Sequence, residues 1–411
     1  MSARLCRACG APVTQPFVDL GSTPLANAYL TERQLAEPEP RYPLRAFVCG
    51  QCWLVQADSF VPPEDIFSHY AYFSSYSDSW VEHARRFTVM ARERFGLNAT
   101  SQVIEVASND GYLLQHFVAA GVPVLGIEPA ANVAEAARRI GVPTEARFFG
   151  RATARDLVTR GLAADLIVAN NVLAHVPDIN DFVAGLAAAL KPDGVVSIEF
   201  PHLLRLIEGV QFDTIYHEHF YYLSLLAVEN VFAAHGLAVF DVEALPTHGG
   251  SLRVLACRAT SPVHQTGAGL GAVRAEERAA GLDRPEGYAL FQSRIAPVRT
   301  GLLRFLDQAA GEGKSVAAYG AAAKGNTLLN FCGVGADRIA CVVDRNPAKQ
   351  GHYLPGSHVP IRPPEHIMET RPDYLLILPW NIREEVMAGM AGIRQWGGRF
   401  VVAVPELAIL P

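Results

Sequence analysis

The feature that most constrains this chain is an alternation of apolar runs with stretches of helical spacing, which occurs in two series. The first series, from about residue 80, contains the runs QVIEVA, VLGIEP, DLIVANNV and VVSIEF. The second, from about residue 315, contains KSVAAYG, RIACVVD, DYLLILP and RFVVAVP. Strands that alternate with amphipathic helices are typical of a parallel sheet with helices on both faces. The pattern therefore predicts two consecutive Rossmann-like, doubly wound α/β domains.

The first 75 residues lack this alternation and hold two CxxC pairs, several prolines and short apolar pieces. Such a segment is typical of a small, irregular domain that needs a staple. We therefore expect three domains, over residues 1–75, 76–260 and 261–411. Residues 237–258 could close the second domain as an antiparallel hairpin, and residues 260–300 read as a helical connector.

Composition excludes several classes of function. The formal net charge of −6 provides no field that would attract a nucleic-acid backbone, so nucleic acid is not an expected partner. The first ten residues hold no apolar signal region, and the apolar runs elsewhere are well short of the ~20 residues of a membrane span. We expect a cytoplasmic protein without a membrane partner, either a monomer or a weak homo-oligomer.

The two cysteine pairs, Cys6 with Cys9 and Cys49 with Cys52, have the spacing at which a tight turn directs two thiols at one ion. Zinc takes four thiolates tetrahedrally, and a closed shell of this kind leaves no position for water. The prediction is a structural Zn²⁺ bound by Cys6, Cys9, Cys49 and Cys52. A reduced or redox-active dithiol is the alternative, and an iron–sulfur cluster fits these spacings less well.

A possible cofactor turn follows the first strand of the first series. The sequence from Glu105 through Ser108, Asn109, Asp110, Gly111 and Tyr112 runs from an apolar strand through a polar turn into a helix. Glu128, followed by Pro129, ends the next strand, where an acidic side chain accepts hydrogen bonds from ribose hydroxyls. Asn170 and Asn171 end a third strand. Because GxGxxG is missing, this set favours S-adenosylmethionine over NAD or FAD, although each residue alone fits ordinary turn chemistry.

A histidine-rich insertion, QFDTIYHEHFYY at residues 211–222, follows the strand VVSIEF. Ligands of open parallel sheets bind beyond the carboxyl ends of the strands, so the insertion falls where a methyl acceptor would meet the cofactor. It could be aromatic packing, and HxH could bind a metal, although no third ligand has a diagnostic spacing. A histidine base is the third interpretation, because carbon becomes a nucleophile only after a proton beside a carbonyl is removed.

Five motifs together resemble the nucleotide-sugar C-methyltransferases of deoxysugar biosynthesis: the paired CxxC head, EVASNDGYLL, YHEHFYYLS, THGGSLRV and YGAAAKGNTLLN. The resemblance implies that His219 is the catalytic base, with Glu218 and Tyr216 beside it. An upstream tyrosine, Tyr72 or Tyr76, would join them, and His248 in the stretch from Thr247 to Ser251 would form part of the wall. A purely structural hairpin is the alternative for that stretch, and the role of His217 stays open.

The second α/β series carries features that suit a diphosphate, namely small residues, free amides, a helix beginning near Asn326, and a cation, Lys324. The resemblance implies that this half binds the nucleotide of a nucleotide-linked keto-sugar, with dTDP as the first choice and GDP possible. The candidate residues are Tyr319, Gly320, Lys324, Asn326, Asp344, Asn346, Trp380 and Asn381. A degenerate half that only packs against the first is the alternative.

The predicted function is S-adenosylmethionine-dependent C-methylation of that sugar, by family analogy at carbon-3 beside a 4-keto group. Two alternatives stay open from the residues alone. One is a nucleotide-sugar dehydrogenase or epimerase, which the missing dinucleotide glycines disfavour. The other is a non-catalytic, zinc-stabilised module that binds a nucleotide.

Overall fold

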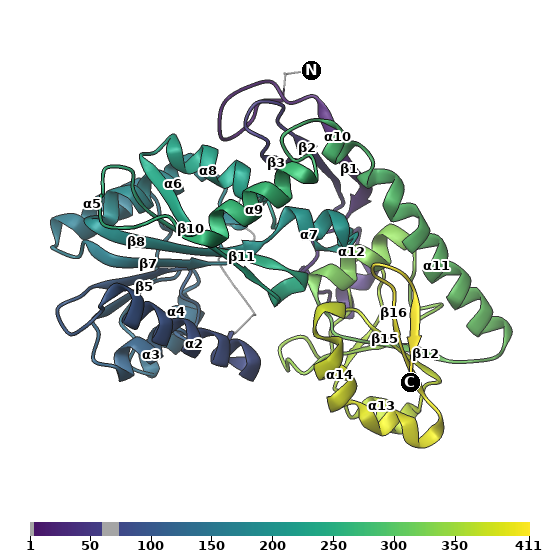
Figure 1. Ribbon diagram of the computed structural model, residues 1–411. Helices are drawn as coiled ribbons and strands as arrows, with labels where there is room; N and C mark the ends of the chain where they lie inside the picture. The colour runs from purple at the N-terminus through teal and green to yellow at the C-terminus, as the bar shows by residue number, and fades with distance from the viewer. Residues whose placement is uncertain (1–3, 60–73) are drawn as a thin grey trace.

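The computed structural model describes residues 4–59 and 74–411, which contain three β-sheets (Figure 1). The sheets have four, seven and six strands. In Figure 1 the seven-stranded sheet and the C-terminal unit lie side by side, and the N-terminal head, in purple, contacts both through the elements described below. The two larger sheets carry helices, which confirms the α/β class predicted from the sequence.

The head contains a small antiparallel sheet in place of the irregular structure expected from its sequence. Its own strands are β1 (Gln15–Thr23), β2 (Tyr42–Val48) and β3 (Val55–Ala57). A fourth strand, β9 (Tyr221–Tyr222), pairs with β3 and comes from the histidine-rich insertion. Of β1, β2 and β3, only β3 is short, and the strand that pairs with its outer edge comes from a segment far away in the chain.

The seven-stranded sheet has the order β10-β11-β8-β7-β4-β5-β6. Its parallel strands are β4 (Val103–Val106), β5 (Val124–Ile127), β6 (Thr144–Glu145), β7 (Ala164–Asn170) and β8 (Leu190–Pro201). β10 (Leu237–Leu245) and β11 (Ser251–Arg258) form an antiparallel hairpin, as the sequence predicted. The order reverses between β4 and β7, which is where open α/β sheets bind ligands.

Helices cover both faces of this sheet because neighbouring strand residues point to opposite sides. Val103 lies in a buried cluster with α2 (Asp78–Phe95), α3 (Leu114–Ala119) and α4 (Ala131–Arg139). Ile104 lies in another cluster with α5 (Arg151–Thr159), α6 (Ile179–Ala189) and α8 (Leu225–Ala233). The side chains of Ser77 and Asp178 accept hydrogen bonds from backbone amides at the starts of α2 and α6, which fixes where these helices begin.

The C-terminal sheet has the order β14-β13-β12-β15-β16-β17, the arrangement of a doubly wound nucleotide-binding fold. Its strands are β12 (Val316–Tyr319), β13 (Val342–Val343), β14 (Ile361–Arg362), β15 (Tyr374–Ile377), β16 (Arg399–Val402) and the antiparallel β17 (Ala408–Leu410). Its helices are α12 (Ala323–Cys332), α13 (His366–Thr370) and α14 (Arg383–Gly389).

Helix α12 begins at Ala323, three residues before the start near Asn326 that the sequence predicted. Gly320, whose φ of 90° is costly for other residues, turns the chain out of β12 directly into this helix. Ala and Lys are also good helix formers, so the helix extends back to them. Lys324 therefore lies in the first helical turn and not in a loop.

Three helices, α9 (Ala268–Ala279), α10 (Glu286–Ala289) and α11 (Phe291–Gly311), confirm the predicted helical connector. α11, in green, runs from the head along the C-terminal unit (Figure 1). The ring of Phe291 stacks on Phe17 of β1, with centroids 4.5 Å apart. Across residues 4–59 and 74–411, no helix has both the length and the apolar character that crossing a membrane requires.

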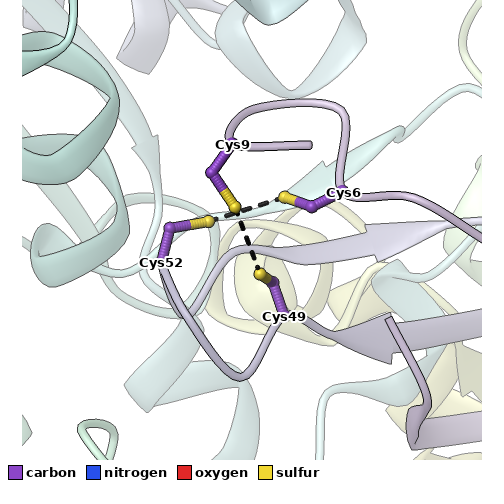
Figure 2. A group of neighbouring side chains, drawn as sticks. All are labelled: Cys6, Cys9, Cys49 and Cys52. Carbon is purple, nitrogen blue, oxygen red and sulfur yellow. Dashed lines mark hydrogen bonds between the residues drawn. The ribbon is translucent and has the colours of Figure 1, made fainter. Parts of the chain in front are cut away.

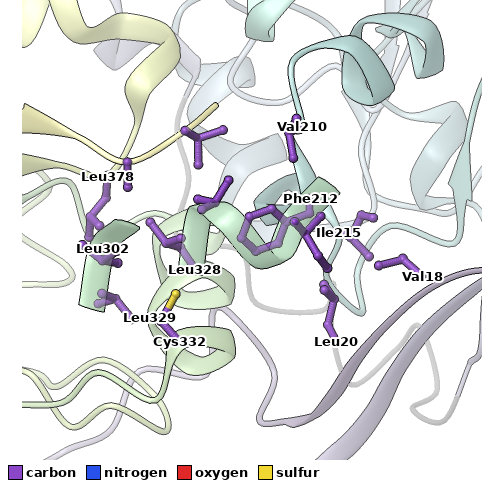
Figure 3. Close-up of a cluster of buried hydrophobic side chains, with 14 of the residues drawn as sticks. Val18, Leu20, Val210, Phe212, Ile215, Leu302, Leu328, Leu329, Cys332 and Leu378 are labelled. Carbon is purple, nitrogen blue, oxygen red and sulfur yellow. The ribbon is translucent and has the colours of Figure 1, made fainter. Parts of the chain in front are cut away.

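A buried apolar cluster joins the head, the insertion and the C-terminal unit (Figure 3). Its labelled members are Val18, Leu20, Val210, Phe212, Ile215, Leu302, Leu328, Leu329, Cys332 and Leu378. Short helix α7 (Leu203–Glu208) leads into the insertion and contributes leucines to the same cluster. The chain just before Tyr216 is therefore anchored between two units by apolar burial.

Candidate active site and zinc site

A cavity of about 2190 Å³ extends between the carboxyl ends of strands in both larger sheets. Residues just after β4, β5 and β7 line one end, and residues just after β12, β13 and β15 line the other. Asn27 and Tyr29 of the head and residues of the insertion line it as well. One continuous space therefore reaches from the predicted cofactor turn to the predicted nucleotide half.

The predicted cofactor turn has an unusual backbone. Asn109 and Gly111 have φ angles of 49° and 82°, in the left-handed region that favours glycine and asparagine. The Glu128 carboxylate, at the end of β5, accepts hydrogen bonds from the amides of Asn109 (3.0 Å) and Ala130 (2.9 Å). Burial raises the pKa of Glu128, and these two amides oppose the shift. The turn is thus fastened to the acidic strand end.

Six of the ten predicted cofactor residues line the cavity: Asn109, Tyr112, Glu128, Pro129, Asn170 and Asn171. The other four, Glu105, Ser108, Asp110 and Gly111, are buried and shape the turn beneath it. Burial and the nearby Asp110 and Glu128 raise the pKa of Glu105 well above its ordinary value. The Oδ1 atoms of Asn170 and Asn171 are buried without a protein partner. These two oxygens can accept hydrogen bonds, so this end of the cavity fits a ligand that carries hydrogen-bond donors.

His219 is held in the tautomer that a base requires. Its Nδ1 lies 2.8 Å from the carbonyl oxygen of Thr214, which can only accept, so the proton is on Nδ1 and the lone pair is on Nε2. The ring lies 4.0 Å from the Tyr216 ring and 4.6 Å from the His175 ring, between centroids. Burial and the nearby His175 lower the pKa of His219 well below its ordinary value, so it is neutral at pH 7.

Glu218 lies beside His219 and lines the same cavity. Its Oε1 accepts a hydrogen bond of 2.7 Å from Nδ2 of Asn27 in the head. Burial raises the pKa of Glu218 to about 7, against the opposing effects of Asn27 and the nearby Lys349. This carboxyl group therefore changes charge near neutral pH.

Replacing Glu218 with glutamine is expected to remove the part of the pH dependence of stability that the titration of this carboxyl group causes. Because the folded-state pKa of about 7 exceeds the ordinary 4.5, the folded state holds a proton that the unfolded chain has released. The stabilisation is complete below pH 4.5 and is lost as the pH rises through 7, in total about 3 kcal/mol. Denaturant titrations at pH 5 and pH 8 measure it.

The matched control is Glu286→Gln, at an exposed position on α10. It should change the free energy of unfolding by less than ~0.5 kcal/mol at either pH. An equal effect of Glu218→Gln at pH 5 and pH 8 would contradict the assignment.

His175 was not predicted from the sequence, yet it lines the cavity beside His219. Its Nδ1 donates a hydrogen bond of 2.8 Å to the Glu218 carbonyl oxygen, and burial lowers the pKa of His175 to about 4. The available signal was its place shortly after the strand end at Asn170 and Asn171. The contact with His219 could not be predicted, because His175 lies far from residues 211–222 in the sequence.

The two tyrosine candidates are four residues apart, and Tyr76 is the one that lies in the described part of the chain. Tyr76 lines the cavity and is 61% exposed, whereas Tyr72 lies outside the described residues. The segment before Tyr76 is tied to the cofactor turn, because the amide of Ser74 donates to Oδ1 of Asn109 at 2.9 Å.

His248 lines the cavity and approaches the cofactor end, with Nε2 3.4 Å from Nδ2 of Asn171. Burial lowers the pKa of His248 to about 4. Thr247 lines the cavity too, whereas the Ser251 hydroxyl donates to the Thr247 carbonyl oxygen at 2.9 Å. His217 points elsewhere, with Nε2 3.2 Å from the Pro43 carbonyl oxygen.

A second group that sequence reasoning missed lies beside the cofactor turn. Trp80 and His83 of α2 line the cavity and stack on each other, with centroids 4.8 Å apart. His83 Nε2 is 2.9 Å from the buried Glu199 carboxylate, which also pairs with Arg253. One helical turn separates Trp80 from His83, a spacing that gave no functional signal without the fold.

Six of the eight predicted substrate residues line the far end of the cavity: Tyr319, Gly320, Lys324, Asp344, Asn346 and Asn381. Lys324 Nζ donates to Oδ1 of Asn381 at 2.6 Å. The Asp344 carboxylate, at the end of β13, accepts from the Ala321 amide at 2.8 Å. Lys349, which was not predicted, donates to the Ala321 carbonyl oxygen.

The structure has Asn326 and Trp380 outside the lining of this cavity, unlike the other six candidates. Asn326 is a buried residue of α12, and its Nδ2 donates to the Ala26 carbonyl oxygen of the head. Trp380 Nε1 donates to the buried Asp213 carboxylate at 2.7 Å. Both residues join units of the molecule in this structure.

The four predicted zinc ligands converge in the head (Figure 2). Their sulfur atoms all lie within 4.8 Å of one another, and the Cys6–Cys52 and Cys9–Cys49 pairs are each 3.5 Å apart. A tetrahedral zinc with bonds of ~2.3 Å requires sulfurs ~3.8 Å apart, so the set fits Zn²⁺. With four thiolates the shell is closed, and the ion would stabilise the fold.

The C-methyltransferase NovU of Streptomyces niveus is 38% identical to this chain over 405 residues, which are 98% of this chain and 96% of NovU. The chain belongs to the C-methyltransferase family. Three family models also match: "Putative zinc binding domain" over residues 6–67, "Methyltransferase domain" over 80–242 and "C-methyltransferase C-terminal domain" over 246–405. The protein is an S-adenosylmethionine-dependent C-methyltransferase with a structural zinc site, which decides against the dehydrogenase and binding-module alternatives.

More distant similarities are confined to part of the chain. A ubiquinone biosynthesis O-methyltransferase of Rhodopseudomonas palustris (strain BisB18) is 28% identical over 109 residues, 26% of this chain and 43% of that protein. A second match is the structure of magnesium protoporphyrin IX methyltransferase (ChlM) from Synechocystis PCC 6803 with bound SAM. The match covers 44% of this chain and 82% of the ChlM chain, at 15% identity and a TM-score of 0.34.

Proposed function

We propose that this C-methyltransferase acts on a nucleotide-linked keto-deoxysugar, at a carbon next to the keto group. The observation that carries the proposal is a neutral His219, with its lone pair on Nε2, in one cavity that joins the cofactor turn to a second nucleotide-type fold. A simple methyl acceptor would need no second fold of this kind. A carbon acceptor needs a base, and His219 provides one.

The cofactor residues support binding of S-adenosylmethionine at the first switch point. The Glu128 carboxylate would hold the ribose hydroxyls, and Asn170 and Asn171 would accept hydrogen bonds from other donors of the cofactor. When bound, the cofactor supplies an electrophilic methyl group on a sulfonium. Trp80 and Tyr112, which stack with centroids 6.1 Å apart, would limit the access of water.

In the proposed reaction, His219 Nε2 takes the proton from the sugar carbon beside the ketone. The C–H electron pair becomes a C=C bond, and the ketone oxygen takes the negative charge, which tyrosine and histidine donors nearby would stabilise. Tyr216 and His248 line the cavity and are the candidates. The carbon then attacks the methyl group, which leaves S-adenosylhomocysteine and a branched sugar.

The C-terminal unit would hold the nucleotide. Lys324, in the first turn of α12, offers a cation and a helix N-terminus to a diphosphate, and Asp344 offers a carboxylate to a ribose. Pro363, Val386 and Met390 add an apolar wall of the kind that accepts a base. We keep dTDP as the first choice, GDP as the second, and carbon-3 beside a 4-ketone as the position.

The proposal includes a division of the chain into three domains. The boundaries 1–75, 76–260 and 261–411 are supported by the three family matches, each of which falls nearly within one of them. The cytoplasmic location and the monomeric or weakly associating state are proposed on composition and charge.

Mass spectrometry of a panel of keto-sugars tests the proposal. Thymidine- and guanosine-diphosphate 4-keto-deoxysugars are incubated with the enzyme and methyl-labelled S-adenosylmethionine, and the expected product is one labelled methyl on carbon of the sugar. Incubation in D₂O without cofactor should exchange the proton beside the ketone, and His219→Gln should not catalyse that exchange. Methylation on oxygen would reject the proposal. So would methylation of an acceptor without a nucleotide when none of these sugars is methylated.

A further inference from the structure

Arg7 lies inside the first cysteine pair, yet its side chain extends to the catalytic insertion. Its Nη2 donates to the carbonyl oxygens of Ala57, at 2.7 Å, and of Phe220, at 2.9 Å. The guanidinium carbon lies 4.9 Å from the centroid of the Tyr221 ring. Phe220 directly follows His219, so a charged donor of the zinc site bonds the main chain next to the base.

The backbone of Arg7 is itself fixed. Its amide donates to Oε1 of Gln56 at 3.0 Å, and Nδ2 of Asn180 donates to its carbonyl oxygen at 2.9 Å. Cys6 and Cys9 on either side of Arg7 are ligands of the predicted ion. The guanidinium therefore projects from a point that the ion, the head and α6 all hold in place.

Phe220 is held from the other side as well. Its amide donates to the Ala174 carbonyl oxygen at 2.7 Å, and its carbonyl oxygen also accepts from the Ala57 amide at 2.9 Å. Ala174 directly precedes His175, so the chain beside His219 is clamped between the cavity wall after β7 and the head. Arg7 supplies the charged contact of this clamp, and hydrogen bonds from charged donors are about twice as strong as neutral ones.

We propose that Arg7 is a positioning residue, which transmits the rigidity of the zinc site to the main chain of His219. Arg7 does not line the cavity, so it acts through the segment and not on the substrate. The inference rests on the proposed role of His219 as base. Misplacing a reacting group by ~1 Å costs ~10²-fold in rate, so the loss of one clamp contact should reach kcat.

Arg7→Met keeps the aliphatic stem and removes both hydrogen bonds. With zinc content at one equivalent, kcat should fall ~10- to 100-fold, while KM and the affinity for S-adenosylmethionine stay within ~2-fold. Hydrogen–deuterium exchange should rise in peptides spanning residues 216–222 and not in those of β7. Arg7→Lys, which keeps the charge but provides one compact donor, should recover part of the rate.

Arg4→Gln is the matched control. Arg4 lies in the same head, where it pairs with Asp58 at 2.9 Å and lies over the ring of Phe47, and both partners are outside residues 211–222. It should leave kcat and the exchange of residues 216–222 unchanged. If Arg7→Met releases zinc, Arg7→Lys is the variant that tests the proposal. When Arg7→Lys retains zinc, a lower kcat supports the proposal, and a wild-type kcat overturns it.

Two further results would overturn the inference. One is wild-type kcat in Arg7→Met, whatever the exchange shows, and the other is an equal loss in Arg4→Gln. A failure of the base role has a different signature, because His219→Gln would then retain turnover while Arg7→Met still loosens residues 216–222.

Discussion

Replacing His219 with glutamine is expected to lower turnover ~10³-fold or more and to leave the affinity for S-adenosylmethionine nearly unchanged. Glutamine can still donate to the Thr214 carbonyl oxygen, as Nδ1 of His219 does. It has no basic lone pair to take the place of Nε2, so under the proposed mechanism the proton beside the ketone would stay on carbon. Turnover with the labelled cofactor and calorimetric titration of the cofactor measure the two quantities.

The control for this variant is His217→Gln, two residues away. His217 lies 3.2 Å from the Pro43 carbonyl oxygen and outside the cavity lining, so its loss should change turnover by no more than ~3-fold. The pH profile adds a second check. Since burial lowers the pKa of His219 well below 6.5, the acidic limb attributable to it should lie below pH 6.5. Activity retained in His219→Gln would remove this residue from the mechanism.

Replacing Cys49 with alanine is expected to release the zinc ion and to lower the free energy of unfolding by several kcal/mol. Cys49 is fully buried and pairs with Cys9 at 3.5 Å, so the remaining three thiolates leave the ion with an open position. Structural zinc contributes ~10–16 kcal/mol in small zinc domains. Elemental analysis and denaturant titration measure both effects.

Cys257→Ala serves as the control for the zinc prediction. Cys257 is a buried thiol on β11, outside the four-cysteine group. This variant should keep one equivalent of zinc and lose only ~1–2 kcal/mol from packing. The dithiol interpretation would replace the zinc site if Cys49→Ala kept its metal and its stability. It would also do so if oxidants, and not chelators, changed the stability of the protein.

Local patterns carried much of the prediction. The two CxxC pairs, the two series of alternating runs and the closing hairpin each depend on residues close together in sequence, and all three appear in the structure. The predicted start of α12 was wrong by three residues, because the turn at Gly320 and the helix propensity of Ala323 and Lys324 together extend the helix toward β12. That small error concealed the first-turn position of Lys324.

Contacts between distant segments could not be predicted from local spacing. Nothing in the sequence around His175 indicates that it meets His219, or that Asn326 turns toward Ala26 of the head. Trp380 followed a strand end, as ligand-binding residues do, yet its ring nitrogen bonds Asp213. Each of these depends on how the units pack, which apolar burial in the shared cluster decides.

The pairing of β9 with β3 has a consequence for biosynthesis. About 165 residues separate the two strands, so the ribosome has released β3 long before its partner exists. During that interval β3 is an open edge, and open edges recruit foreign strands. Early metal capture by the cysteines would hold the nascent head compact meanwhile. The edge of β3 stays open without β9, so a fragment ending at residue 75 should aggregate even when it is saturated with zinc. Coexpression with the rest of the chain should prevent this aggregation.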